Sequence, residues 1–420
     1  MSFDVSVIRE QFPALRKAAI YLDNPAGTQV SQSVIDRMQT YLKEYNANYG
    51  GVFQTSRQSD AVIAEARMAM ADFVNAERPE EIVFGPNMTT LTFNLSRALG
   101  RWLNVGDEII VTHLDHDANI TPWVMVAEER QCKVRWVDFG REDGTLNMAR
   151  LESLLENKPR LVAVGYASNA LGTINPIADI VKKAKEVGAV VFIDAVQYAP
   201  HGPIDVQELG CDFLACSAYK FFGPHVGVLY GRYDLFDELN AYKVRPASNK
   251  PPGKFETGTQ NFEGIAGLLG AIEYLEWVGA KYGGRYTEKY ESRYKNRKLY
   301  LKQAMAAIRA YEFELSRALL ENLEETPGVT IHGLQDVRRL EERVPTFSFT
   351  VNGMHPRYVA EVLDKEGIYV WDGNYYALAV TEWLGLEESG GMVRVGPVHY
   401  NTIQEIQQFG DALRMLTLDI

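Results

Sequence analysis

An acidic and a basic side chain end two apolar segments that follow one another along the chain. Asp194 closes the run VVFID at 190–194, and Lys220 follows the run DFLACSAY at 212–219. One strand–helix–strand step would bring both side chains to the same edge of a sheet. A carboxylate there can keep a pyridinium nitrogen protonated, and a lysine can form a Schiff base with an aldehyde. The pair is therefore typical of a pyridoxal phosphate site.

Other polar side chains stand at the ends of the same apolar segments. Asn169 follows the run LVAVGYAS, Gln197 lies three residues after Asp194, and Ser217 lies three residues before Lys220. Each residue alone has an ordinary explanation, because an Asp at a strand end is often a helix cap and a lone lysine is usually solvated. Because these polar residues stand at the ends of three apolar segments, we predict that they belong to one site.

A possible anion site lies in the segment GPNMTTLTFNLSRAL at 85–99, where a turn opens into a helical pattern. Thr89 and Thr90 stand at the start of this helix. Free backbone N–H groups and hydroxyls at a helix N-terminus can bind a phosphate, but a threonine can also simply cap the helix, and both interpretations stay open. The nucleotide motifs G-x-x-x-x-G-K-S/T and G-x-G-x-x-G after a strand are absent.

The segment THLDHDAN at 112–119 raises the alternative of a metal site, because it contains His113, Asp115, His116 and Asp117. The spacing H-x-D-H-D differs from the metal motifs H-x-H-x-D-H and H-E-x-x-H, and the remaining histidines form no second cluster. We predict no metal. A metallohydrolase that uses the cluster from His113 to Asp117 is the alternative from a different class.

The elements that would position these residues alternate between β-rich and helical patterns from about residue 80 to 235. This alternation predicts βαβ units and an α/β fold with a largely parallel sheet, covered by helices on both faces. A ligand is then expected at the carboxyl ends of the strands. A helix is predicted over 175–189, and the predicted strands are the runs 81–84, 108–113, 133–139, 161–168, 190–194 and 212–219.

The pattern changes after about residue 280, where a charge-rich helical stretch over 281–325 predicts a connector. Tyr286, Tyr290 and Tyr294 recur every four residues in it, which indicates a packing or solvated helix face. Strand and helix patterns beyond it predict a small α+β unit. We predict an N-terminal segment packed with the small domain, a large cofactor-binding domain, and the connector with the small C-terminal domain, over residues 1–20, 21–280 and 281–420.

Composition restricts the partners and the compartment. The 420 residues include 43 Lys and Arg against 55 Asp and Glu, so the net charge of −12 makes nucleic acid an unfavourable partner. The sequence has no leader-type pattern and no long apolar run, so we expect no membrane contact. Three cysteines are too few for a disulfide framework, which favours the cytoplasm and burial of Cys211 and Cys216.

Two motifs in combination identify a family resemblance. They are Asp194-Ala-Val-Gln197 after a strand and Ser217-Ala-Tyr219-Lys220-Phe-Phe-Gly223-Pro224. The chain resembles fold type I pyridoxal phosphate enzymes, within them the class V aminotransferase family, which includes cysteine desulfurases, selenocysteine lyases and isopenicillin N epimerases. The resemblance runs from YLDNPAGTQ at 21–29 to VRVGPVHYNT at 393–402. It implies a large domain with a mostly parallel, seven-stranded sheet and a smaller α+β domain.

The resemblance also implies catalytic roles. Lys220 would attach pyridoxal 5'-phosphate and move the proton at Cα, Asp194 would pair with the ring nitrogen, and His116 would stack on the ring. Arg394, in VRVGPVHYNT, would hold the α-carboxylate of an amino-acid substrate.

The remaining cofactor contacts follow from the same resemblance. Asn169 and Gln197 would contact the phenolic oxygen of the cofactor ring. Thr259, in FETGT at 255–259, would reach the phosphate of the neighbouring subunit, which implies a homodimer with shared sites. The residues that would bind the phosphate within the same subunit are Thr89, Thr90 and Ser217.

The chain departs from the desulfurase pattern in one loop. Cysteine desulfurases carry a nucleophilic cysteine in a segment that corresponds to GIYVWDGNYYALAV at 367–380, and no cysteine stands there. Trp371, Tyr375 and Tyr376 occupy this segment and could shape a substrate pocket or pack at a domain edge. We therefore expect lyase chemistry, by C–S cleavage or β-elimination, or aminotransferase chemistry on a small α-amino acid, with epimerisation at Cα as the alternative.

Overall fold

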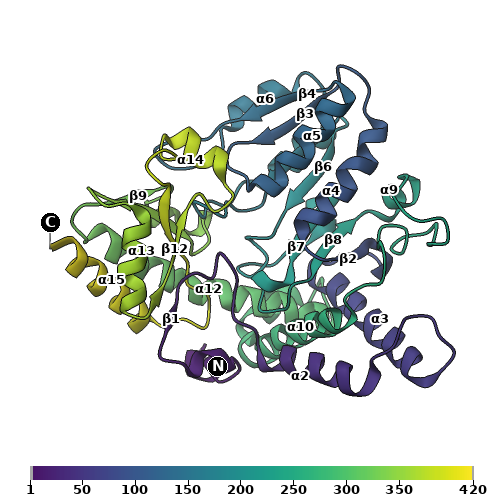
Figure 1. Cartoon of the computed structure of the whole chain (residues 1–420), viewed down its shortest axis with the longest axis horizontal. Coiled ribbons are helices and arrows are strands. Elements are labelled where there is room, and N and C mark those ends of the chain that lie inside the picture. The colour runs from purple at the N-terminus through teal and green to yellow at the C-terminus, as the bar shows by residue number, and fades with distance from the viewer. Residues whose placement is uncertain (1–2, 419–420) are drawn as a thin grey trace.

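The computed structural model describes residues 3–418, and it contains a large and a small sheet, each with its own helices, and a further two-stranded sheet (Figure 1). The large sheet has seven strands in the order β2-β8-β7-β6-β5-β3-β4. All neighbouring strands are parallel except β8, which runs antiparallel to both β2 and β7. The strands are β2 (Ile82–Gly85), β3 (Glu108–Thr112), β4 (Lys133–Val137), β5 (Leu161–Gly165), β6 (Val190–Asp194), β7 (Phe213–Ser217) and β8 (Gly227–Gly231).

The predicted α/β fold with a largely parallel sheet is confirmed, and each predicted run overlaps a strand. Strand β8 was missed, because the run GVLYG is short and its glycines resemble turn residues. The predicted helix over 175–189 is present as α7 (Ile177–Glu186). Cys211 and Cys216 are buried as expected.

Alternate side chains of the large sheet pack against two different helix layers. Ile109 and Val111 share one apolar cluster with Leu95 of α4, whereas Ile110 shares the other cluster with Leu268 of α10. Apolar residues on both faces explain why these strands lack the alternation of a solvent-facing sheet. The first layer contains α4 (Met88–Leu99), α5 (Thr121–Arg130) and α9 (Tyr233–Glu238), and the second contains α3 (Gln54–Val74), α6 (Met148–Leu155), α7, α10 (Phe262–Tyr282) and the first half of α12 (Asn296–Glu324).

The small sheet is antiparallel, in the order β12-β13-β10-β9. Val393 and Val395 of β13 pack with Phe347 of β10 and Phe409 of α15 in a separate apolar cluster. Arg394 lies between these two valines and therefore points to the opposite face of the sheet. The elements are β9 (Val329–His332), β10 (Phe347–Val351), α13 (Pro356–Lys365), β12 (Trp371–Gly373), α14 (Leu378–Leu384), β13 (Met392–Val395) and α15 (Ile403–Leu418).

The helical stretch predicted over 281–325 is not one helix. Helix α10 ends at Tyr282, Gly283 and Gly284 follow, and α11 (Thr287–Tyr290) is short, so the long helix α12 begins only at Asn296. Tyr290 and Tyr294 are buried in a small cluster of their own, which fits the predicted packing role but not a continuous helix face. The first half of α12 packs with the large sheet and the second half with the small sheet.

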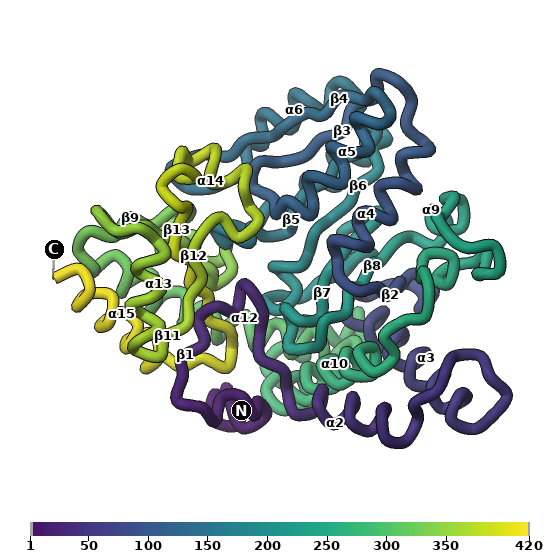
Figure 2. Tube along the Cα trace, in the orientation of Figure 1, coloured from purple at the N-terminus to yellow at the C-terminus, as the bar shows by residue number. Residues whose placement is uncertain are grey.

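The N-terminal segment lies beside the C-terminal part of the chain, as Figure 2 shows. Strand β1 (Ile20–Tyr21) pairs in parallel with β11 (Ile368–Tyr369), and Arg9, at the end of α1 (Val5–Arg9), forms an ion pair with Glu405 at 2.9 Å. The remaining helices are α2 (Gln32–Thr40) and α8 (Val206–Leu209). The domain limits at residues 20 and 280 stay predictions. None of the described helices is both long and apolar enough to cross a membrane.

Candidate active site

A cavity lies at the carboxyl ends of β5, β6 and β7, where the sheet topology predicts a ligand. Side chains from the start of α4 and from the loop after β3 complete its wall. The cavity brings together most of the predicted site residues, which are Thr89, His116, Asn169, Asp194, Gln197, Ser217 and Lys220.

Asp194 is the last residue of β6, so the strand carries its carboxylate into the cavity wall. The side chain is buried and accepts a hydrogen bond from the backbone N–H of Val196 at 2.9 Å. Burial raises the pKa of Asp194 to about 6, although Lys220 and the Val196 N–H oppose the rise. These two interactions offset only part of the cost of burying the carboxylate, so Asp194 is suited to pair with a cationic group of a ligand.

Lys220 ends a short 3-10 turn over Ala218–Lys220, directly after β7. Its buried Nζ donates a hydrogen bond to the carbonyl of Pro25. Burial and the nearby charge of Arg394 lower the pKa of Lys220 to about 7, against the opposing effects of Asp194 and Asp23. A substantial fraction of the amine is therefore neutral near pH 7, as a nucleophilic lysine requires.

The start of helix α4 lines the same cavity with Asn87, Met88 and Thr89. Asn87 is the cap residue, and its Oδ1 accepts the N–H of Thr90 at 2.8 Å, so neither threonine caps the helix. Ser217 accepts the N–H of Met88 at 3.0 Å and so ties the end of β7 to this helix. Thr89 lines the cavity, whereas Thr90 does not. Thr89, Ser217 and the N-terminus of α4 thus lie together at the cavity, and phosphate binding by Thr89, Thr90 and Ser217 stays a prediction.

His116 lines the cavity with an imidazole whose Nδ1 accepts the N–H of Ala118 at 3.0 Å. Burial, Lys220 and Arg394 lower the pKa of His116 to about 3, so the ring is neutral at physiological pH. A neutral imidazole is suited to stack on another aromatic ring. It already lies 5.7 Å from the Tyr376 ring, at an interplanar angle of 18°.

Arg394 lies beside the cavity, on the face of β13 that points away from the small-domain core. Its guanidinium donates to the carbonyl of Asn169 at 2.9 Å and lies over the Tyr375 ring at 4.3 Å. Although Arg394 is not in the cavity wall, its charge affects the pKa of both Lys220 and His116. The arginine is thus close enough to attract an anionic group in the cavity.

Unpartnered polar atoms test whether a cofactor fits this site. The buried atoms Asn169 Oδ1, Gln197 Oε1 and Arg394 Nε have no hydrogen-bond partner among the described residues. Such atoms cost about 1–3 kcal/mol each when they stay unpaired, so a polar ligand that reaches them would be stabilised. The two amide oxygens, the carboxylate of Asp194 and the amine of Lys220 are suited to the hydroxyl, ring nitrogen and aldehyde of pyridoxal phosphate.

The metal alternative is not supported by the geometry of its cluster. Asp115 accepts hydrogen bonds from Thr112 and Asn119, and Asp117 accepts one from Thr121 at 2.7 Å. The His113 ring lies against Trp136 and Trp383, with centroids 4.7 and 5.1 Å away. Over residues 3–418, no group of three His, Cys, Asp or Glu side chains is placed to hold a metal ion.

Thr259 does not reach this cavity. It is exposed, in a separate hollow that Tyr49, Met68 and Val244 also line. Its contact with the phosphate site of a second subunit stays a prediction.

Several residues of the site were missed by the sequence analysis. Asp23 is close to Lys220 and Arg394, and burial raises its pKa against the effect of both cations. Asp115 and Tyr219 line the cavity, and burial raises the pKa of Asp115 to about 7. An acidic residue soon after a buried strand was the available signal for Asp115, but its sequence neighbours suggested a metal instead. No local pattern marked Asp23.

Comparisons with known proteins show the family of this chain. The sequence profile "Aminotransferase class-V" matches residues 20–297 and 295–409. The aminotransferase-like protein FGM3 of Gibberella zeae is 37% identical, and the alignment covers 99% of both chains. A cysteine desulfurase of Pectobacterium atrosepticum is 33% identical over 99% of this chain and 98% of its own. The apo structure of a cysteine desulfurase from Thermococcus onnurineus is 30% identical, covers 99% of this chain and 98% of its own, and superposes with a TM-score of 0.86.

The fold, the cavity and these relatives together define a fold type I enzyme that depends on pyridoxal phosphate. The chain belongs to the class V aminotransferase family, in its cysteine desulfurase-like part.

Proposed function

We propose that the protein binds pyridoxal phosphate in the cavity around Lys220 and acts on an α-amino acid by lyase or aminotransferase chemistry. The observation that carries this proposal is the grouping of Asp194, Lys220 and Arg394. A carboxylate for the ring nitrogen, an amine of lowered pKa and a cation for a substrate carboxylate lie around one cavity.

The lining residues offer a partner for each part of the cofactor. Asp194 would pair with the ring nitrogen, His116 would stack on the ring, and Lys220 would bind the aldehyde carbon. The ring hydroxyl would lie near Asn169 and Gln197, and the phosphate near Thr89, Ser217 and the start of α4. When bound, pyridoxal phosphate supplies an electron sink that stabilises negative charge at the Cα of the substrate.

The protein residues would bind the substrate and move its protons. Arg394 would hold the α-carboxylate through its unpartnered Nε, which fixes the orientation of Cα above the cavity. The Lys220 amine, once free, would take a proton from Cα or return one, since its pKa of about 7 suits both directions near neutral pH. Asp194 would keep the ring nitrogen protonated during these steps.

No thiol is placed for the nucleophilic attack that the resemblance implies for desulfurases. Residues 367–380 contain no cysteine, and Cys211 and Cys216 are buried with their pKa values raised by burial. Burial also raises the pKa of Cys132, which does not line the cavity. We therefore infer C–S lysis, β-elimination or transamination without a protein persulfide. No feature of the site specifically favours the epimerase alternative.

We also propose that the enzyme is a homodimer. Thr259 lies in a hollow that exposed Tyr49 and Val244 also line, and the exposed Val52 and Phe53 follow Tyr49 closely in the sequence. An apolar face of this kind is typical of a subunit contact. A second copy would cover it and place Thr259 near the neighbouring phosphate site. The three free cysteines support a reducing, cytoplasmic environment.

Product analysis separates the two proposed reactions. The enzyme loaded with pyridoxal phosphate is mixed with alanine, cysteine and phenylalanine in turn, without a keto-acid acceptor. Continuous release of ammonia and keto acid would assign a lyase. One equivalent of keto acid per site, with turnover only after an acceptor is added, would assign an aminotransferase. No keto acid from any amino acid would overturn the proposal.

A further inference from the structure

Two aromatic side chains of one loop are exposed beside the substrate end of the site. Trp371 is 50% exposed and Tyr376 is 76% exposed, whereas Tyr375 between them is buried. Large aromatic side chains bury much apolar area when they are covered, so exposed ones beside a ligand site are candidates for contact with that ligand.

The strand register places Trp371 next to Arg394. Trp371 stands directly opposite Arg394 in the antiparallel pair of β12 and β13, and residues opposite one another project from the same face. The next residue, Asp372, projects from the other face, where it forms an ion pair with Arg357 of α13 at 3.2 Å. Ser348 also stands opposite Arg394, on β10, and donates to the carbonyl of Ala170 at 2.7 Å. This face therefore meets the loop after β5, at the active site.

Tyr376 is fixed beside His116 at the other end of the loop. Its carbonyl accepts the N–H of Asp117 at 2.6 Å, and its ring stacks on the His116 ring. The carbonyl of Tyr375 accepts the side-chain amide of Asn169 at 2.9 Å. Tyr375 and Tyr376 both have positive φ, of 58° and 57°, a conformation that non-glycine residues adopt only at a cost in free energy. The contacts with the cavity loops hold the strained segment in place.

The chemistry of the loop favours a neutral, apolar occupant. Asp372 is paired with Arg357, and Glu387, which lines the adjacent recess, accepts hydrogen bonds from Asn374 and Thr381. Both acidic side chains of this recess thus have partners within the protein, so neither is free to attract a cationic substrate. The buried Tyr375 ring covers one face of the Arg394 guanidinium, so Arg394 remains the anion-binding group beside the two exposed rings.

We propose that Trp371 and Tyr376 form the side-chain subsite and that the substrate is an α-amino acid with a large apolar or aromatic side chain. Arg394 holds its carboxylate, while its side chain lies between the two rings, away from Lys220. This subsite rests on the function proposed above and replaces the expectation of a small amino acid.

Calorimetric binding of two carboxylates without an amine tests the subsite apart from turnover. The probes are 3-phenylpropanoate and propanoate, titrated into the enzyme loaded with pyridoxal phosphate. We expect 3-phenylpropanoate to bind about tenfold more tightly than propanoate. Trp371→Ala and Tyr376→Ala should each reduce this ratio about fivefold and leave propanoate binding unchanged. Tyr358→Ala, which removes an aromatic ring that is 51% exposed on α13, is the matched control and should not change the ratio.

The result for Arg394→Gln separates the subsite from the proposed function. One outcome is that Arg394→Gln weakens the binding of both probes while Trp371→Ala and Tyr376→Ala keep the wild-type ratio of the two affinities. In that case the proposed subsite is wrong and the carboxylate site is supported. If neither probe binds the wild type, or Arg394→Gln binds both as the wild type does, the carboxylate site itself is wrong. A variant of Trp371 or Tyr376 that splits the oligomer in light scattering, with the ratio unchanged, would assign the rings to a subunit contact and overturn the proposal.

Discussion

At the scale of single residues, burial in one cavity moves the pKa values of Asp194 and Lys220 toward each other. The carboxyl rises to about 6 and the amine falls to about 7, because each charged form loses contact with water. In an ordinary exposed pair both groups would be fully charged at pH 7. Here a small change in pH changes the protonation of both.

This shift predicts the pH dependence of cofactor attachment. In the proposed site the free amine of Lys220 attacks the cofactor aldehyde, so the rate of attachment should rise with pH, with its midpoint near 7, and level off above it. The test is the rate at which a visible absorption band forms when pyridoxal phosphate is mixed with apoprotein between pH 5.5 and 9. A rate that keeps rising through pH 9, as for a solvated lysine, would contradict the burial of this amine.

Asp194→Asn should leave the cofactor bound but slow the reaction about 100-fold or more. The amide keeps the size of the side chain but no longer holds a proton on the ring nitrogen by charge. Turnover with excess amino acid and the cofactor content of the purified variant are measured together, and Asp194→Glu should recover part of the rate. A fully active Asp194→Asn enzyme would show that the carboxylate charge is not used.

Local patterns were sufficient to predict several polar residues of the cavity, because these residues follow apolar strands closely in the sequence. Lys220 and Ser217 belong to one short motif, and Asp194 and Gln197 to another. Asp23 and the loop with Tyr375 and Tyr376 come from distant segments that carry no such pattern. Only the tertiary fold brings them within reach of Lys220 and His116.

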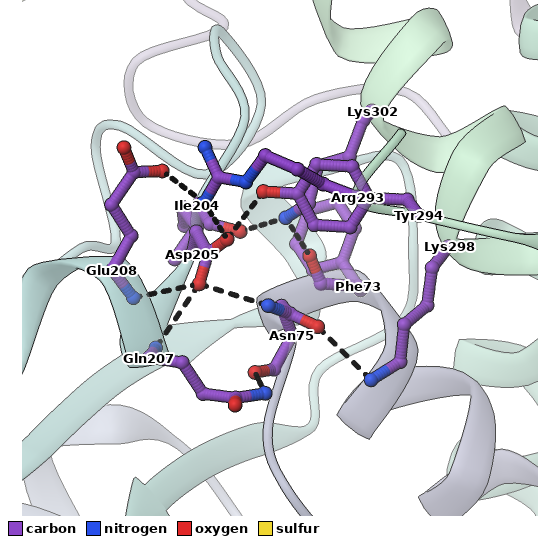
Figure 3. A network of polar contacts seen from close by, with 10 residues as sticks. All are labelled: Phe73, Asn75, Ile204, Asp205, Gln207, Glu208, Arg293, Tyr294, Lys298 and Lys302. Atoms are coloured by element: carbon purple, nitrogen blue, oxygen red, sulfur yellow. Dashed lines mark hydrogen bonds and ion pairs between the residues drawn. The ribbon is translucent and has the colours of Figure 1, made fainter. Parts of the chain in front are cut away.

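At the scale of elements, a polar network attaches the start of α12 to the loop before α8 and to the end of α3 (Figure 3). Lys302 is buried, and its Nζ donates to the carbonyls of Ile204 and Phe73. Burial lowers the pKa of Lys302 to about 8, although Asp205 opposes this. Burial would likewise raise the pKa of Asp205, but hydrogen bonds from Tyr294 and Asn75 hold it below its usual range.

Tyr294→Phe should destabilise the protein by about 1.5–3 kcal/mol, because it removes a hydrogen bond to the partly buried carboxylate of Asp205. Urea unfolding of the apoprotein provides the measurement. Tyr300→Phe on α12 is the matched control and should change the free energy of unfolding little, since Tyr300 is 39% exposed. Equal stabilities of the two variants would contradict a structural role of the network.

Helical periodicity predicted the helices around this network but not their ends. The stretch over 281–325 contains several apolar and charged repeats, but Gly283 and Gly284 follow α10, and the helical pattern resumes in α12. The tyrosines at 290 and 294 pack across this interruption. The burial of Tyr290 and Tyr294 agrees with the packing alternative that the four-residue spacing left open, but the spacing wrongly predicted a continuous helix.

At the scale of the whole molecule, the two sheets and the proposed second copy must act together. Arg394 comes from the small sheet and Lys220 from the large one, and α12 packs with both. The parallel sheet was predictable from alternating patterns along the chain. The place of the antiparallel strand β8 between β2 and β7, and the exposed apolar face, depend on contacts between distant segments, which the sequence does not display.

The double variant Val52→Glu with Phe53→Glu should be monomeric in light scattering and should lose most activity. The two side chains are 89% and 55% exposed, and charges there would oppose burial in a subunit contact. Val105→Glu places a charge at another site that is 74% exposed and should leave the dimer intact. A wild type that is monomeric and fully active would contradict the shared site.

The most direct test of the central claim is the position of the cofactor on the chain. The enzyme loaded with pyridoxal phosphate is reduced with borohydride, digested and analysed by mass spectrometry, beside the Lys220→Ala variant. We predict that the reduced cofactor is attached to the peptide that contains Lys220 and is absent from the variant. Attachment to a different lysine, or equal labelling of the variant, would contradict the assignment of this cavity as the active site.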